Sequence, residues 1–268
     1  MGAINIGSLA LPVAPLALLG ALFLGIFVAR RAAHKLDLEP ALWKIFLTGV
    51  LAARAAFVVV YFDSYRSAPL RMLDIRDGGF LVAAGLLAAL ATTAWYAWRQ
   101  REGRKPLLLA VLAGLSLWGG ALLTATVMER EASPLPELAL ERLEGGTVRL
   151  DALKGKPVVI NLWATWCPPC RREMPALRDA QQRHPDVIFI LANQREGQGV
   201  IRRYLDAEGL VLDNVLLDAR GALGRMTGSQ ALPTTLFFAA DGLLASRRIG
   251  ELSTATLEQR IEALKEAR

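Results

Sequence analysis

Two cysteines are the residues of this 268-residue chain with the clearest chemical potential, and they lie close together at Cys167 and Cys170. The segment Trp166-Cys167-Pro168-Pro169-Cys170 follows an apolar, strand-like run, Val158–Trp163, and precedes a helical pattern. A helix amino terminus favours a thiolate through its free N–H groups and its partial positive charge. Cys167 is therefore the predicted attacking sulfur. Cys170, one helical turn later, can then attack the mixed disulfide that Cys167 forms.

A static disulfide and a zinc site are the two alternatives for such a cysteine pair. A disulfide that closes only two intervening residues restrains the unfolded chain little, so it would stabilise the fold weakly. A zinc site needs two further ligands, but the only histidines are His34, in another part of the chain, and His184, a predicted helix cap. We therefore expect no metal and no cofactor beyond a redox-active Cys167–Cys170 disulfide.

The elements around the cysteines alternate between strands and helices. Predicted strands are residues 158–163, 187–191, 215–217, 235–239 and 244–249, and predicted helices are residues 169–183, 198–208, 219–226 and 254–267. Strand–helix alternation that ends in a hairpin, with Ala240-Asp241-Gly242 as its turn, predicts an α/β domain. We expect a mixed central sheet with helices on both faces.

This half of the chain, residues 137–268, resembles the TlpA/ResA-type thiol-disulfide oxidoreductases of the thioredoxin superfamily. The resemblance rests on residues 156–175 and on Ala231-Leu232-Pro233-Thr234-Thr235, which matches the cis-proline loop of that family. Asn161, where thioredoxin itself has an aspartate, also fits this group. The resemblance implies a thioredoxin-like fold in which Pro233 is cis and the adjacent backbone binds the substrate chain.

The same resemblance implies roles for residues near the cysteines. Glu173 would tune thiol acidity and proton transfer, and the alternative is an exposed carboxylate on the helix surface. Trp166 would form a platform beside the sulfur that partners approach, whereas Trp163 is predicted to lie in the core. The expected catalytic residues are Cys167, Cys170 and Glu173, and the expected substrate-binding residues are Trp166, Pro168, Pro169, Leu232 and Pro233.

The first 131 residues differ from the rest in composition. With 53% hydrophobic and 21% charged residues, the chain is too apolar for an ordinary soluble protein and too charged to lie wholly in a membrane. Four stretches are long and apolar enough to cross a bilayer, at about residues 9–29, 41–62, 79–98 and 106–128. The sequence predicts an all-α transmembrane domain over residues 1–131, a linker at 132–136 that contains Ser133, and the thioredoxin-like domain.

Positive charge flanks the predicted spans. Residues 1–131 carry thirteen Lys and Arg against eight Asp and Glu, whereas residues 132–268 carry eighteen against seventeen. Basic residues beside apolar runs indicate membrane helices and argue against a nucleic-acid partner. The positive-inside rule places two loops in the cytoplasm, and their basic residues are Arg30, Arg31, Lys35, Arg99, Arg101, Arg104 and Lys105. We predict a multi-pass protein of the bacterial inner membrane, with its N-terminus and its thioredoxin-like domain in the periplasm.

The membrane half carries a second, weaker resemblance. Residues 51–57 and 74–80 resemble part of the prolipoprotein diacylglyceryl transferase family, over about residues 45–90. That family has a histidine shortly after its Gly-Gly pair, where this chain continues with Phe80 and four apolar residues. Arg54 is the one charge deep inside a predicted span, where it is costly. It is interpreted either as part of a polar cavity or as an arginine that snorkels or pairs with a loop aspartate.

Three functional hypotheses are consistent with these features. The first is a membrane-anchored periplasmic oxidoreductase that reduces disulfides of extracytoplasmic proteins, for instance in cytochrome c maturation; a disulfide oxidase or isomerase would use the same residues. The second is a lipid-modifying membrane protein with a redox-sensing domain, and the third is a non-catalytic adaptor or metal chaperone. Because no cysteine lies in the predicted spans, the first hypothesis needs a separate membrane electron donor, of the DsbD/CcdA kind by resemblance.

Overall fold

The chain divides into two compact units. The computed structural model of the protein describes residues 3–6, 9–33, 36–66, 69–132, 134–228 and 230–266. One unit comprises Pro12–Ala125, and the other comprises Thr126–Arg268 together with Met1–Leu11. The predictions above that involve His34, Lys35 and Ser133 fall outside the described residues.

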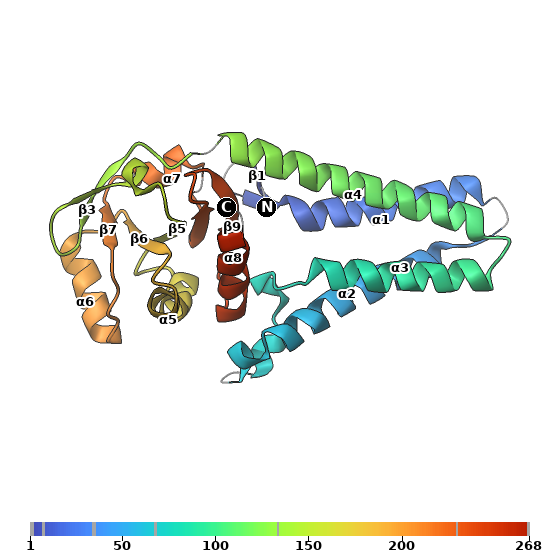
Figure 1. The fold of residues 1–268 in the computed structure, drawn as a ribbon, viewed down its shortest axis with the longest axis horizontal. Coiled ribbons are helices and arrows are strands. Elements are labelled where there is room, and N and C mark those ends of the chain that lie inside the picture. Colours follow the sequence, from blue (N-terminus) through green and yellow to red (C-terminus); the bar gives the residue numbers. More distant parts are fainter. Residues whose placement is uncertain are drawn as a thin grey trace. The chain divides into compact units, whose positions relative to one another are not determined.

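Long helices build the first unit (Figure 1). They are α1 (Val13–Ala32), α2 (Glu39–Val60), α3 (Val82–Arg99) and α4 (Arg104–Ala132), and short 3-10 helices, η1 (Phe62–Tyr65), η2 (Pro69–Leu73) and η3 (Ile75–Asp77), connect α2 to α3. The predicted first span began at residue 9, but Leu9–Pro12 is strand β2, which pairs with β1 (Ala3–Ile6). The helix begins later because proline, which lacks an N–H, fits only its first turn, where Pro15 lies.

Among the described residues, three helices are long and apolar enough to cross a membrane. They are Val13–Ala32, Glu39–Val60 and Arg104–Ala125, with mean hydropathies of 2.1, 1.7 and 2.0. Helix α3, which begins three residues after the start of the predicted span at 79–98, is not one of them. Its second half carries polar and amphipathic side chains that lower its hydropathy, namely Thr92, Thr93, Trp95, Tyr96, Trp98 and Arg99. Length and composition therefore support three of the four predicted spans.

Small residues let the helices of this unit approach each other closely. Between α2 and α3, a Cβ added at Gly85 would lie 2.9 Å from both the Ala53 Cβ and the Gly49 carbonyl oxygen. Between α1 and α4, a Cβ added at Gly114 would lie 2.9 Å from the Ala21 carbonyl oxygen. Such small-residue seams are typical of membrane helices, which associate by close packing because lipid is as apolar as their side chains. The seams pair α2 with α3 and α1 with α4.

Arg54 is buried in this unit, and its guanidinium is bound by the connection between α2 and α3. Its Nη1 donates to Asp77 Oδ1 at 3.0 Å and to the Gly79 carbonyl at 2.8 Å. Its Nη2 donates to the Met72 carbonyl at 2.9 Å. The second carboxylate oxygen of Asp77 accepts a hydrogen bond from the Tyr65 hydroxyl at 3.0 Å. Arg54 thus pairs with a loop aspartate, which was the simpler of its two interpretations.

We expect Arg54→Ala to lower the stability of the helical unit, because it leaves the Asp77 carboxylate buried without its cation. The two side chains are 11% and 9% exposed, and breaking a buried ion pair costs about 3–5 kcal/mol. Arg66→Ala is the matched control, since the side chains of Arg66 and its partner Asp63 are 71% and 85% exposed. Thermal unfolding of the detergent-solubilised protein checks this expectation. Equal losses in the two variants would contradict the anchoring role of Arg54.

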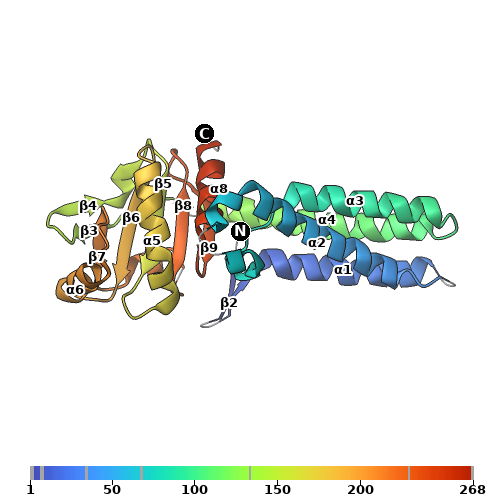
Figure 2. The same cartoon turned by 90° about the horizontal axis from the view of Figure 1, so that it is seen from below.

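The second unit contains a mixed sheet with helices packed against it (Figure 2). Its strands are β3 (Ala139–Arg142), β4 (Thr147–Arg149), β5 (Val158–Trp163), β6 (Ile188–Gln194), β7 (Val215–Asp218), β8 (Thr234–Phe238) and β9 (Leu244–Ile249). Its helices are α5 (Pro168–Arg183), α6 (Gln198–Glu208), α7 (Ala222–Met226) and α8 (Thr254–Glu266), and a 3-10 turn, η4, covers Leu150–Leu153. In the described residues the strand order is β4-β3-β7-β6-β5-β8-β9. Strands β5, β6 and β7 are parallel, and the remaining pairings are antiparallel, which confirms the predicted mixed sheet.

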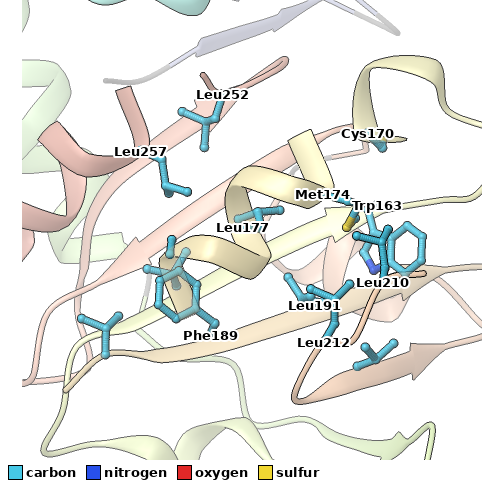
Figure 3. Packing of buried hydrophobic residues seen from close by; sticks show 14 of the residues in the cluster. Trp163, Cys170, Met174, Leu177, Phe189, Leu191, Leu210, Leu212, Leu252 and Leu257 are labelled. Carbon is cyan, nitrogen blue, oxygen red and sulfur yellow. The ribbon is translucent and has the colours of Figure 1, made fainter. Parts of the chain in front are cut away.

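Strand β5 lies at the centre of the sheet, and its side chains alternate between two hydrophobic clusters. Val159 and Trp163 belong to the cluster that contains residues of α5 and α8, whereas Ile160 packs with Leu223 of α7 in the other cluster. Figure 3 shows Trp163 close to Met174 of α5 in the first cluster. Helices therefore cover both faces of the sheet, and α5 is docked on the face that carries the odd-numbered residues of β5.

Candidate redox site

The cysteine pair lies where strand β5 leads into helix α5. Cys167 and Cys170 form a disulfide with an S–S distance of 2.09 Å. Cys167 is the N-cap residue of α5, and its Sγ accepts a hydrogen bond from the backbone N–H of Cys170 at 3.3 Å. Pro168, which is exposed, and Pro169, which is half-buried, fill the first two helical positions, where a missing N–H costs little. This geometry places the Cys167 sulfur at the positive end of the helix dipole.

The sulfur atoms are nearly buried beside one exposed aromatic ring. Cys167 is 2% exposed and Cys170 is fully buried, whereas Trp166 is 67% exposed. Trp163, three residues earlier, is fully buried in the core, as the sequence predicted. A large exposed indole next to a reactive sulfur presents an apolar surface on which a partner chain can pack.

The Leu232–Pro233 peptide bond is cis, as the family resemblance implied. Strand β8 begins at the next residue, Thr234, which pairs with Leu162 of β5. The cis-proline loop therefore lies next to the end of β5 that leads into the cysteine segment. Leu232 also lines one pocket together with Trp166. The fold thus brings these expected substrate-binding residues to the same place.

Glu173 lies buried in α5, one turn after Cys170. Its Oε1 accepts a hydrogen bond from Asn161 Nδ2 at 2.8 Å, and its Oε2 accepts one from the backbone N–H of Leu252 at 2.9 Å. Burial raises the pKa of Glu173 from 4.5 to about 8, although both hydrogen bonds act to lower it. Glu173 is only 1% exposed, so the alternative of a surface carboxylate is wrong.

Asn161 connects this carboxyl group to the strand that follows the cis-proline. Besides its bond to Glu173, the Asn161 Nδ2 donates to Thr235 Oγ1 at 3.0 Å, and Thr235 is two residues after Pro233. Asn161 is fully buried on the face of β5 against which α5 packs. A continuous set of hydrogen bonds therefore joins α5, β5 and β8 within the core that also holds the disulfide.

Glu196 is a residue of the site that the sequence did not reveal. Its carboxylate accepts the backbone N–H of Thr165 at 2.7 Å, the Thr165 hydroxyl, and the side-chain amide of Asn193 at 2.7 Å. Thr165 is two residues before Cys167, so Glu196 fixes the segment that leads into the disulfide. The available signal was the polar run from Asn193 to Glu196, which begins in the last residues of a buried strand, at the edge where α/β sheets place their sites.

Comparisons with known proteins match the two halves of the chain separately. A family model described as AhpC/TSA family matches residues 132–247, and one described as Prolipoprotein diacylglyceryl transferase matches residues 2–121. Thiol-disulfide oxidoreductase ResA of Halalkalibacterium halodurans is 29% identical over 52% of this chain and 79% of its own length. Thiol:disulfide interchange protein DsbE of Escherichia coli is 32% identical over 50% of this chain and 72% of its own length. The solved structure of MTB dsbF is 25% identical and covers 48% of this chain and 98% of its own, with a TM-score of 0.46.

A disulfide at the start of a helix, beside a cis-proline loop on a mixed sheet, defines a thioredoxin-like domain that performs thiol–disulfide exchange. The chain belongs to the family of thioredoxin-like thiol-disulfide oxidoreductases that includes ResA and DsbE. Its N-terminal half is similar to the prolipoprotein diacylglyceryl transferases over a longer stretch than residues 45–90 alone had indicated. The protein therefore joins a thiol-disulfide oxidoreductase domain to an apolar helical unit.

We expect the free energy of unfolding of the thioredoxin-like unit to fall as the pH rises from 4.5 to about 8. Folding raises the pKa of Glu173, so the stability that its neutral form contributes is fully present below pH 4.5 and is lost as the pH rises through about 8. Each pKa unit corresponds to about 1.4 kcal/mol, which makes the whole change a few kcal/mol.

Urea unfolding of the wild-type protein and of Glu173→Gln across this pH range provides the measurement. Because glutamine does not ionise, Glu173→Gln should remove most of the pH dependence and be the more stable protein at neutral pH. Glu144→Gln, at an exposed position, is the control and should follow the wild type. Parallel stability curves for the wild type and Glu173→Gln would show that the buried carboxyl does not titrate in this range.

Proposed function

We propose that the protein is a membrane-anchored thiol–disulfide reductase whose thioredoxin-like unit faces the periplasm and reduces disulfides of selected extracytoplasmic proteins. The observation that supports this most directly is the position of Cys167, which caps α5 and accepts the Cys170 N–H at its sulfur. This position favours a Cys167 thiolate as the attacking group. The cysteine pair itself carries the two electrons. An oxidase or isomerase would use the same residues at a less reducing potential, so the direction of electron flow is part of the proposal.

In the proposed reaction, the thiolate of reduced Cys167 attacks one sulfur of a substrate disulfide. A disulfide forms between Cys167 and the substrate, and the other substrate sulfur leaves as a thiolate that takes up a proton. Cys170 then loses its proton and attacks the Cys167 sulfur, which breaks the mixed disulfide and releases the second substrate thiol. The substrate gains two electrons and two protons, and the cysteine pair becomes the disulfide seen in the structure.

Glu173 is the group that we propose as the proton acceptor for Cys170 in the second step. It lies one turn after Cys170, and its pKa of about 8 is close to the value of about 8.5 for a free thiol. A proton can pass between two groups of similar pKa with little free-energy cost, which is what general acid–base catalysis requires. The hydrogen bonds from Asn161 and Leu252 hold the carboxyl group in place during the exchange.

We expect Cys170→Ala to accumulate a covalent adduct between Cys167 and a substrate protein, because the resolving sulfur is absent. Cys167→Ala should form no such adduct, since it lacks the attacking thiolate. Non-reducing electrophoresis of membrane fractions, followed by mass spectrometry of reductant-sensitive bands, measures both outcomes.

Cys167→Ala is the matched control because it also leaves a single cysteine in the same segment. Recovery of no adduct with Cys170→Ala would count against disulfide exchange with protein substrates. Adducts of equal amount in the two variants would instead contradict the assignment of Cys167 as the attacking residue.

We further propose that α3 crosses the membrane together with α1, α2 and α4, which makes four spans. Helix α3 packs along α2, and α2 is apolar enough to span a membrane. A Cβ added at Gly49 would lie 3.3 Å from the Ala89 Cβ, and the Thr48 and Thr92 hydroxyls are hydrogen-bonded at 3.1 Å. Two helices that pack side by side in this way share the same depth in a bilayer. Four spans also return the chain to the side on which it began, with the basic end of α1 at Arg30 in the cytoplasm.

Single cysteines introduced into a variant without Cys167 and Cys170 test this topology. We expect Ser64→Cys, between α2 and α3, to react with a membrane-impermeant maleimide added to intact spheroplasts. Glu102→Cys, between α3 and α4, should react only after the membrane is permeabilised, because its loop is cytoplasmic in the proposal.

Glu144→Cys, in the thioredoxin-like unit, is the control for a position outside the membrane. Labelling of Glu102→Cys from outside would contradict a membrane-spanning α3. Protection of Glu144→Cys in intact spheroplasts would contradict the periplasmic location of the redox site.

Electrons must reach the cysteine pair from another protein in this proposal. Both cysteines lie in the thioredoxin-like unit, so residues 12–125 contain no thiol that could relay electrons across a bilayer. We propose a membrane donor of the DsbD/CcdA kind, which would reduce the Cys167–Cys170 disulfide after each turnover. The transferase-like half would then serve as the anchor, with its buried Arg54 engaged by Asp77 and by backbone carbonyls.

A further inference from the structure

A pocket next to the redox site is lined by one cationic side chain. It has a volume of about 120 Å³, and its lining includes Trp166, Gln194, Arg195, Gly221, Gln230 and Leu232. A single water needs about 10–15 Å³ of such space, so a side chain of several heavy atoms fits. Trp166 precedes Cys167 and Leu232 precedes the cis-proline, which places the pocket where residues flanking a substrate cysteine would lie.

Arg195 is held on the wall of this pocket by an unusual backbone. Its φ is 62°, in the left-handed region that residues other than glycine rarely adopt. A Cβ added at Gly221 would lie 2.7 Å from the Arg195 Nε, so the absence of a side chain at Gly221 makes room for the arginine. Backbone strain kept beside a reactive group is typical of positions that serve a function.

The carboxylates that neighbour Arg195 are occupied by other donors. Glu196 binds Thr165, and Asp218 accepts the backbone N–H of Ala222 at 2.7 Å at the start of α7. Within the described part of the chain, no ion pair joins Arg195 to a carboxylate, and its side chain is exposed. The guanidinium is therefore available to an anionic group from a ligand.

The pocket is tied to the cysteine segment through Glu196. This residue directly follows Arg195, and its carboxylate holds the backbone N–H of Thr165, the residue before Trp166. The backbone that carries Arg195 is thus tied to the backbone that carries Trp166, which keeps the two residues on the same pocket wall. Arg220, next to the lining residue Gly221, is exposed and adds to the positive charge of this region.

We propose that Arg195 selects substrate disulfides that have an acidic residue next to the reactive cysteine. The Asp or Glu side chain of the substrate enters the pocket and pairs with the guanidinium, while the substrate chain packs against Trp166. This inference rests on the proposed reductase function and narrows its substrate class. Arg195 is a specificity-determining residue, and the exchange at Cys167 proceeds without it.

The test compares reduction of two peptide disulfides that differ only in a Glu or a Lys next to the cysteine. At low salt, the full-length wild type, reduced beforehand and freed of reductant, should react with the Glu peptide with a roughly fivefold higher second-order rate constant, and added salt should reduce the difference. Arg195→Glu should reverse this preference. Arg203→Glu makes the same charge change at an exposed position of α6 outside the pocket and should leave the preference unchanged.

A small neutral substrate, hydroxyethyl disulfide, separates failure of the proposed function from failure of this inference. If the wild type reduces neither this compound nor the peptides, the reductase function is wrong. If it reduces the compound but treats both peptides equally, or if the two glutamate variants shift the preference equally, the role of Arg195 is wrong. Arg195→Lys keeps the charge at the same backbone position and should retain most of the preference, so a folding defect in Arg195→Glu would not decide the result.

Discussion

The arrangement of the redox site depends on the burial of one carboxyl group, that of Glu173. Hydrogen bonds from Asn161 and from the Leu252 backbone join helix α5 to strand β5 and to the segment before α8, and this fixes the helix that carries the disulfide. The same burial raises the pKa of Glu173 to about 8. An apolar side chain at this position would remove the acceptor of both hydrogen bonds, and it could not exchange a proton. A buried carboxyl group with a raised pKa is typical of functional sites, and the proposed role of Glu173 as a proton acceptor accounts for its position.

The other parts of the site come from strand ends that the sheet brings together. Parallel pairing of β5 with β6 places Glu196 beside Thr165, and antiparallel pairing of β5 with β8 places the cis-proline loop beside the cysteine segment. The pocket at Arg195 forms from the same strand ends. The cysteine pair and the pocket at Arg195 thus depend on the same sheet but use different residues. The cysteines need a helix terminus, whereas the pocket needs the loop after β6.

The helical unit solves a different physical problem. Glycine and alanine contacts such as that between Gly85 and Ala53 bring α2 and α3 close together, which is how helices associate where the surroundings are as apolar as their side chains. A buried charge must be satisfied by the protein itself, and Arg54 meets this need with Asp77 and backbone carbonyls of the α2–α3 connection. In the thioredoxin-like unit, by contrast, the sheet and its two apolar clusters supply the packing.

Local sequence determined the features that depend on neighbours along the chain. Residue periodicity and spacing predicted the strand–cysteine–helix order around Cys167, the central strands and the apolar helices. They did not predict the short strands β3 and β4, because three or four residues give too little pattern. The tertiary structure alone decided the burial of Glu173, whose partner Leu252 is 79 residues away in the chain. It also decided the hydrogen bond between Glu196 and Thr165 and the ion pair between Arg54 and Asp77. These contacts join segments that are far apart in the chain. They set the pKa of Glu173, the position of the segment before Cys167 and the neutralisation of Arg54 by Asp77. Their residues carry no local pattern, because burial and partners are properties of the packed fold.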